Sequence, residues 1–247
     1  VGLALVAVSR GHESQLLGER AMGILVLIII GAVGTTIGIL GTRAYAAELT
    51  YKRALDAAAR NEGKVLYDLL ILAVDQNPNV DRYHITLSQT NLLLANGIAN
   101  KKGKDVTEDD RRTITQLVQQ AIREAQRAVA VNNRLSTSWE NLGRVYRTLI
   151  PFAAGADRWA VSGYTQAIAL EPTNPLLLII LGGVHFAAWL YDDAVKAFEL
   201  AVALKPDLAN SHYNLSAALR EKGDISRAVR EMEQVLTLVE EGTQDYD

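Results

Sequence analysis

The stretch SWENLGRVY, from Ser138 to Tyr146, combines a tryptophan, a Leu-Gly pair and a tyrosine in the order W-x2-L-G-x2-Y. Residues three or four positions apart lie on one face of an α-helix, so this spacing predicts a helix whose inner face holds large side chains around one glycine. A glycine at such a place lets a second helix approach closely. One copy of the pattern would be weak evidence, so its recurrence along the chain decides the interpretation.

The pattern recurs at a step of 34 residues. Pro175 to Leu208 contains Leu-Gly and then Ala, Phe, Ala and Pro at the corresponding distances, and further steps forward and back give related residues. This set resembles the tetratricopeptide repeat (TPR), in which each unit is a pair of antiparallel helices. The signature residues of the two clearest copies are Trp139, Leu142, Gly143, Tyr146, Ala160, Tyr164, Ala167, Pro172, Leu181, Gly182, Ala194, Phe198, Ala201 and Pro206.

The register predicts about five repeats, near 47–80, 81–135, 136–174, 175–208 and 209–242. Stacked units of this kind bury a continuous core that no single unit has. The second repeat holds extra polar residues, NKKGKDVTEDDRR, in which Thr107 and Asp110 resemble an N-terminal helix cap. The sequence therefore predicts an all-α chain, with hydrophobic transmembrane-type helices over 1–43 and an α-solenoid over 44–247.

The N-terminal part is strongly apolar. Residues 21–42 carry no charge, and at about 1.5 Å per residue this run is long enough to cross a hydrocarbon core of about 30 Å. Residues 1–9 are also uncharged, so the linker RGHESQLLGER predicts a hairpin between two apolar helices. Gly34 and Gly38 form a G-x-x-x-G pair that either lets helices pack closely or is simply tolerated in lipid. The abrupt start predicts a fragment of a longer protein or a processed product.

Composition excludes several classes of function. The net charge is −3 with mixed signs and aromatic residues make up 6%, which argues against a nucleic-acid partner. The absence of cysteine excludes disulfides, Cys-based zinc sites and thiol catalysis. His84, His185 and His212 fall in or beside signature positions, which predicts core or groove residues rather than metal ligands. No phosphate loop or Rossmann glycine pattern is present. We therefore expect a non-enzymatic protein without catalytic residues, cofactor or metal.

Two helices have apolar faces that need a partner. The segment PLLLIILGGVHFAAWLY, from Pro175, is apolar nearly all round, which predicts burial by its neighbours or by another chain. The last helix, over about 225–239, has an apolar face that no following helix covers. A head-to-tail contact of this face with another copy would build an open filament. The possible assembly surface comprises Gly34, Gly38, Leu177, Ile180, Val229, Leu236 and Val239.

The TPR resemblance implies a concave groove lined by the first helix of each repeat, which in this family usually holds a peptide. The best-known version has a carboxylate clamp of Lys, Asn and Arg. The groove candidates of this chain include Glu140, Arg144 and Leu176 and do not form that clamp. Recognition of acidic C-termini is therefore not expected.

The chain also resembles the C-terminal region of multi-pass bacterial membrane proteins related to O-antigen ligases. The segments that carry this resemblance are the apolar span, YKRALDAAARNEGKVLYDLL, NPNVDRYHITLSQTNLLLAN and QQAIREAQRAVAVNN. It implies a TPR region outside the cytoplasm, membrane-associated or extracellular. Three functions follow: a module that self-assembles, for example into a filament, a membrane-tethered binding module, or an accessory domain of a glycan polymerase. The expected partners are other proteins, copies of the same chain, and a membrane through residues 21–42.

Overall fold

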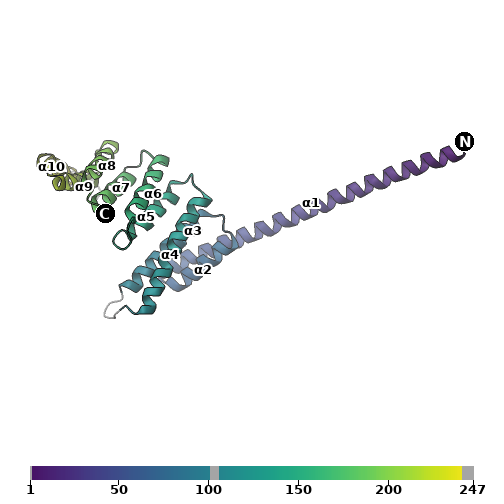
Figure 1. The fold of residues 1–247 in the computed structure, drawn as a ribbon, viewed down its shortest axis with the longest axis horizontal. Coiled ribbons are helices and arrows are strands. Elements are labelled where there is room, and N and C mark those ends of the chain that lie inside the picture. The colour runs from purple at the N-terminus through teal and green to yellow at the C-terminus, as the bar shows by residue number, and fades with distance from the viewer. Residues whose placement is uncertain (1, 101–105, 241–247) are drawn as a thin grey trace.

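The computed structural model describes residues 2–100 and 106–240, and every regular element among them is an α-helix (Figure 1). The all-α solenoid predicted from the sequence is confirmed. The helices are α1 (Gly2–Ala59), α2 (Gly63–Gln76), α3 (Asp81–Ala99), α4 (Glu108–Val131), α5 (Ser136–Leu149), α6 (Ala156–Leu170), α7 (Pro175–Ala187), α8 (Tyr191–Leu204), α9 (Ala209–Lys222) and α10 (Ile225–Glu240).

Helix α1 is a single helix that extends far beyond the solenoid (Figure 1). The predicted hairpin over 1–43 is wrong. Residues 10–20 contain no proline, and their Glu, Gln, Leu and Arg residues favour helix strongly enough to outweigh the isolated Gly11 and Gly18. The predicted helix over 21–42, continuous with the segment that follows it, is confirmed.

Consecutive helices pack as pairs, and the pairs stack on one another. The C-terminal part of α1 packs on α2, and the pairs α3–α4, α5–α6, α7–α8 and α9–α10 follow in order (Figure 1). Alanines fill the places where paired helices approach most closely. Those with no exposed surface include Ala54, Ala57, Ala121, Ala125, Ala160, Ala167, Ala194 and Ala201.

The helix ends follow local sequence signals. Helix α4 begins with a capping box, in which Thr107 Oγ1 accepts a hydrogen bond from the Asp110 amide and the Asp110 carboxylate accepts one from the Thr107 amide. The predicted cap is therefore confirmed. Helices α6 and α8 end two residues before Pro172 and Pro206, because proline cannot continue a helix.

Candidate protein-interaction surfaces

The TPR signature residues build the core rather than a site. Tyr164 and Phe198 are almost completely buried, and the signature alanines have no exposed surface. Trp139, Tyr146 and Leu181 are half-buried, while the two signature prolines lie in turns. These side chains position the helices, so any interaction surface must come from other residues.

The first signature position has a recurrent polar role. Trp139 Nε1 donates a hydrogen bond to the carbonyl oxygen of Asn133, six residues earlier, at 2.9 Å. His212 occupies the same position in α9, and its Nε2 lies 2.9 Å from the carbonyl oxygen of Pro206, also six residues earlier. Because a carbonyl oxygen only accepts, His212 Nε2 donates here. A histidine thus fixes the turn before its helix as the tryptophan does.

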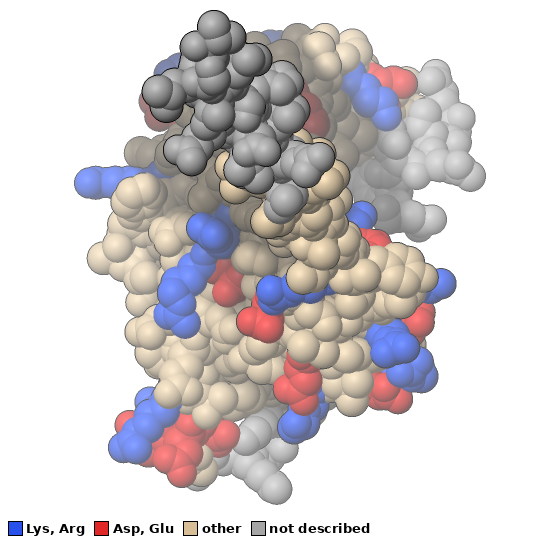
Figure 2. Space-filling model, turned by 90° about the vertical axis from the view of Figure 1, so that its right-hand side faces the viewer, with Lys and Arg blue, Asp and Glu red and all other residues tan. Residues whose placement is uncertain are grey.

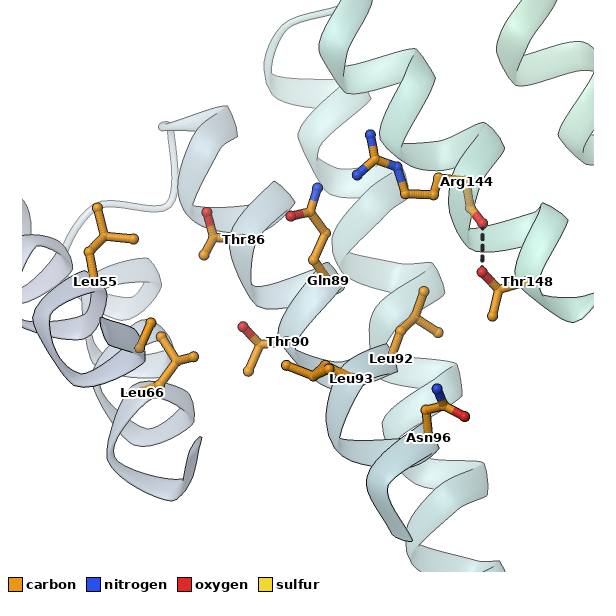
Figure 3. A pocket seen from close by; sticks show the side chains of 11 residues that line it. Leu55, Leu66, Thr86, Gln89, Thr90, Leu92, Leu93, Asn96, Arg144 and Thr148 are labelled. Atoms are coloured by element: carbon orange, nitrogen blue, oxygen red, sulfur yellow. Dashed lines mark hydrogen bonds between the residues drawn. The ribbon is translucent and has the colours of Figure 1, made fainter. Parts of the chain in front are cut away.

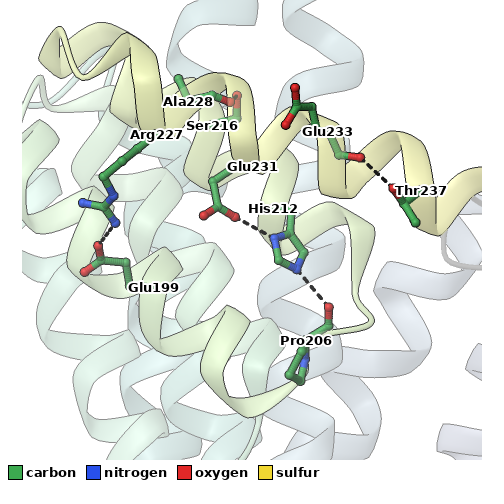
Figure 4. Close-up of polar contacts among 9 residues, drawn as sticks. All are labelled: Glu199, Pro206, His212, Ser216, Arg227, Ala228, Glu231, Glu233 and Thr237. Atoms are coloured by element: carbon green, nitrogen blue, oxygen red, sulfur yellow. Dashed lines mark hydrogen bonds and ion pairs between the residues drawn. The ribbon is translucent and has the colours of Figure 1, made fainter.

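The other ring nitrogen of His212 connects α9 to α10. Nδ1 lies 2.7 Å from an oxygen of Glu231, and four residues after the histidine Ser216 Oγ donates to the carbonyl oxygen of Ala228 at 2.8 Å (Figure 4). The guanidinium of Arg227 also pairs with Glu199 of α8. These contacts fix the rotation of α10 about its own axis, and so determine which face of the helix packs on the solenoid.

The same network occurs between α3 and α4. His84 Nδ1 lies 2.6 Å from a Glu124 oxygen, and its Nε2 lies 2.9 Å from the carbonyl oxygen of Pro78. Ser88 Oγ donates to the carbonyl oxygen of Ala121 at 2.9 Å. Both histidines are buried. Each one joins the two helices of its own repeat, which is a structural role.

His185 differs from these two histidines. It lies half-buried in α7, and its Nδ1 has no hydrogen-bond partner in the described part of the chain. Burial lowers the pKa of His185 below the ordinary value for histidine, since a protonated ring would lose its hydration there. This arrangement favours the neutral ring in the folded protein.

The outer face of α10 carries an uncovered apolar stripe, which we call the α10 seam (Ile225, Val229, Met232, Leu236 and Val239). Ile225, Val229, Leu236 and Val239 are 55%, 52%, 59% and 45% exposed, and Met232 is half-buried. On the adjacent face of the helix, Ala228 and Val235 are buried in the solenoid. Three residues of the predicted assembly surface therefore lie together on one exposed face.

Of two other residues of that predicted surface, Leu177 lies in the core and Ile180 is half-buried. Leu177 is only 2% exposed, and Ile180 packs against a buried cluster that includes Tyr164 and Val184. Leu177 therefore cannot belong to an assembly surface, because its side chain is already buried in the solenoid, while the assignment of Ile180 stays a prediction. Leu176, on the groove-facing side, is 54% exposed.

The N-terminal part of α1 presents a second apolar surface. By length and composition, Leu25–Ala59 is the helical segment among the described residues that is suited to crossing a membrane, and none of its most apolar part is buried. Gly34 and Gly38 are exposed, and a Cβ atom added at either would meet nothing within 4 Å. The glycine face is therefore open to a partner helix or to lipid.

A groove lies between the first helices of the first three repeats (Figure 3). Its volume is ≈ 500 Å³, and it is lined by Leu55, Ala58, Leu66, Thr86, Gln89, Thr90, Leu92, Leu93, Asn96, Arg144 and Thr148. Leu93, at its mouth, is 68% exposed. Arg144 is the one charged residue of this lining, and it pairs with Glu140 at 2.5 Å. The groove lining therefore combines apolar side chains with uncharged polar ones, and it is not a basic surface.

The described residues contain no group of three His, Asp or Glu side chains placed to hold a metal ion. Acidic and basic side chains lie side by side over the face seen from the N-terminal end of α1 (Figure 2). That face shows no continuous basic patch of the kind that binds nucleic acid.

Comparison with known proteins identifies the fold of the chain. No family model matches the chain. The Hsp70-Hsp90 organizing protein of Triticum aestivum is 34% identical over 87 residues, which is 35% of this chain and 15% of that protein. The chain thus matches only a small part of that relative's length. These comparisons do not show the predicted resemblance to O-antigen ligases.

Three solved structures superpose on most of the chain. A MamA protein has a TM-score of 0.62 at 17% identity, covering 81% of this chain and 95% of that one. MamA from Desulfovibrio magneticus RS-1 has a TM-score of 0.62 at 14% identity, covering 80% and 97%. A thermophilic TPR protein of Thermus thermophilus has a TM-score of 0.53 at 18% identity, covering 79% and 93%. The chain therefore has the fold of a TPR-like solenoid.

Proposed function

We propose that this chain is a non-enzymatic interaction and assembly module that associates with other copies of itself. The observation that carries the proposal is the α10 seam, an apolar face at the end of the solenoid that no residue of the described chain covers. A contiguous exposed patch of this kind is typical of a protein-protein contact. Assembly into a filament, predicted from the sequence, remains part of this proposal.

Residues 21–42 anchor the module in a membrane in this proposal, with the solenoid on the extracytoplasmic side. The exposed apolar length of α1 supports the anchor. The side of the membrane rests on the resemblance to the tails of O-antigen ligase-like proteins.

The groove gives the module a second binding surface in the same proposal. Its leucines and uncharged polar side chains suit a peptide segment of mixed apolar and polar character. An acidic C-terminus would find no free cation there, because Arg144 is already paired with Glu140. Nucleic acid is not an expected partner.

Self-association is tested on the full chain in mild detergent by analytical ultracentrifugation and electron microscopy. We expect a concentration-dependent oligomer for the wild type and a smaller species for Leu236→Glu combined with Val239→Glu. A wild type that stays monomeric at every concentration would contradict the proposed self-association.

The anchor is tested separately by carbonate extraction of membranes from cells that express the full chain. We expect the wild type to stay in the membrane fraction and Ile29→Arg with Val33→Arg to leave it, since each charge opposes insertion by about 2.5–3.5 kcal/mol. Leu49→Arg, outside the apolar run, is the matched control and should remain with the membranes. Equal extraction of all three proteins would refute the anchor.

A further inference from the structure

The spacing of the α10 seam is that of a coiled-coil interface. The exposed residues Ile225, Val229, Leu236 and Val239 follow one another at intervals of four, seven and three, with Met232 at the intermediate position. These intervals reproduce the a and d positions of a heptad, in which apolar residues face a second helix. The most fitting occupant is therefore an α-helix with an apolar stripe of its own.

Within the solenoid, the equivalent face is covered by a helix. The residues 34 positions before Val229, Met232 and Leu236 are Val195, Phe198 and Val202 of α8. Val195 and Phe198 are buried and Val202 is partly buried, all in a cluster with residues of α9. The partners from α9 are Leu215, Ala218 and Leu219. The α10 seam thus continues an interface that already exists one repeat earlier.

The opposite end of the solenoid does not match this face. In the first repeat, Arg53 and Asp56 of α1 stand where the last repeat has Leu215 and Ala218. Both are exposed. Stacking the α10 seam on α1 of another copy would take these two charges out of water against apolar side chains, which is unfavourable because neither charge gains a partner there. The head-to-tail contact expected from the sequence is therefore disfavoured.

We infer that the α10 seam binds the α10 seam of a second copy across a two-fold axis, with the two helices antiparallel. This inference rests on the proposed self-association and specifies its contact. An apolar stripe is complementary to itself, as a two-fold interface requires. Arg230 lies on the N-terminal side of the middle of α10 and Glu233 on its C-terminal side, and both are exposed. Antiparallel pairing brings each Arg230 toward Glu233 of the other copy and opposes the helix dipoles.

A two-fold contact closes on itself. It joins two copies and leaves no free seam for a third, whereas a head-to-tail contact would continue indefinitely. Any larger assembly must then use another surface, such as the glycine face of α1.

The test uses complementary charges in the full chain in detergent. Copies with Val229→Glu and Leu236→Glu should lose the wild-type dimer in sedimentation, and so should copies with Val229→Lys and Leu236→Lys. An equimolar mixture of the two variants should restore a dimer that contains one copy of each. Leu200→Glu, which adds a charge at a leucine of α8 that is 57% exposed and lies outside both the seam and the groove, is the matched control and should dimerise as the wild type does.

Three results would overturn the inference. If the Glu variant still dimerises, the copies associate through another surface, and the proposed self-association stands while this contact fails. If the mixture stays monomeric, the seam meets a different surface on its partner, which again spares the proposed function. If the wild type is monomeric, both fail.

The antiparallel orientation is tested by cross-linking, which is straightforward because the chain has no cysteine of its own. Copies with Ser226→Cys, co-expressed with copies carrying Thr237→Cys and a different tag, should form mixed products with a short bismaleimide. Products that link only like copies would show a parallel pair and overturn the orientation.

Discussion

Gly182 of α7 and Phe198 of α8 lie so close together that a Cβ atom added to the glycine would be 2.5 Å from Cε1 of the ring. Phe198 is almost completely buried among Val195, Leu215 and Leu219, so its ring has little room to move away. The glycine of the TPR pattern is therefore required here by the neighbouring helix.

Gly182→Ala should lower the thermal midpoint of unfolding, because overpacking a tight core costs about 1–3 kcal/mol. The adjacent Gly183 is exposed, and a Cβ atom there would meet nothing within 4 Å. Gly183→Ala is thus a matched control, which should keep or raise the midpoint since alanine favours helix by about 0.8–1.0 kcal/mol over glycine. Thermal unfolding of the two variants, followed by circular dichroism, tests this prediction. Equal midpoints would contradict it and would mean that α8 moves to accommodate the added methyl group at little cost.

Glu124→Ala should destabilise the α3–α4 pair. It leaves the buried Nδ1 of His84 without its carboxylate partner, at a cost of about 1–3 kcal/mol. The neighbouring Arg123 is exposed, so Arg123→Ala should change the stability by less than about 0.5 kcal/mol. Urea titration followed by circular dichroism compares them. A loss equal to that of the control would show that the pair contributes nothing.

His185 should make the protein less stable as the pH falls. Its pKa is lowered by burial in the folded state, so the unfolded chain takes up the proton first as the pH decreases through about 6.5, the ordinary value for histidine. Because the unfolded state then binds more protons than the folded state, the free energy of unfolding decreases as the pH decreases through that window. His185→Tyr, which places the signature residue at this position, should show a smaller drop between pH 7.5 and 5.5. Thermal midpoints at both pH values measure the difference, and parallel curves would contradict the effect.

Thr107→Ala should loosen the start of α4. The capping hydrogen bonds of Thr107 are lost, and replacing such a cap with alanine costs about 0.5–2 kcal/mol. Thr113→Ala, on an exposed turn of the same helix, removes a threonine without removing a cap and should be neutral or slightly stabilising. Hydrogen exchange of the amides in the first turns of α4 reports the difference directly. Unchanged protection in the Thr107 variant would show that the cap is dispensable.

The solenoid could be predicted from the sequence because its signals are local and repeated. Pro172 and Pro206 mark helix ends, Thr107 and Asp110 mark a helix start, and small residues such as Gly182 recur where helices cross. Each signal lies within a few residues of the structure that it determines. Repetition in a common register then made the separate signals consistent.

Contacts between distant residues could not be predicted in the same way. The His84–Glu124 pair joins residues 40 positions apart and the His212–Glu231 pair residues 19 apart, so finding them requires the relative rotation of two helices. The shared spacing of His84 with Ser88 and of His212 with Ser216 was the available signal. Leu177 was misassigned for a similar reason, because its burial depends on how tightly the preceding repeat packs.

The apolar stretch and the first helix of the solenoid are parts of one uninterrupted rod, α1, without a proline along its length. From residue 42 to residue 59 this rod measures about 26 Å, at 1.5 Å per residue. Since the helix is not interrupted, tilting its N-terminal part by some angle rotates the whole solenoid by the same angle. Turning the rod about its axis likewise decides which side of the solenoid faces whatever surrounds residues 25–42. A force applied to α10 would therefore act as a torque on the apolar N-terminal part of α1.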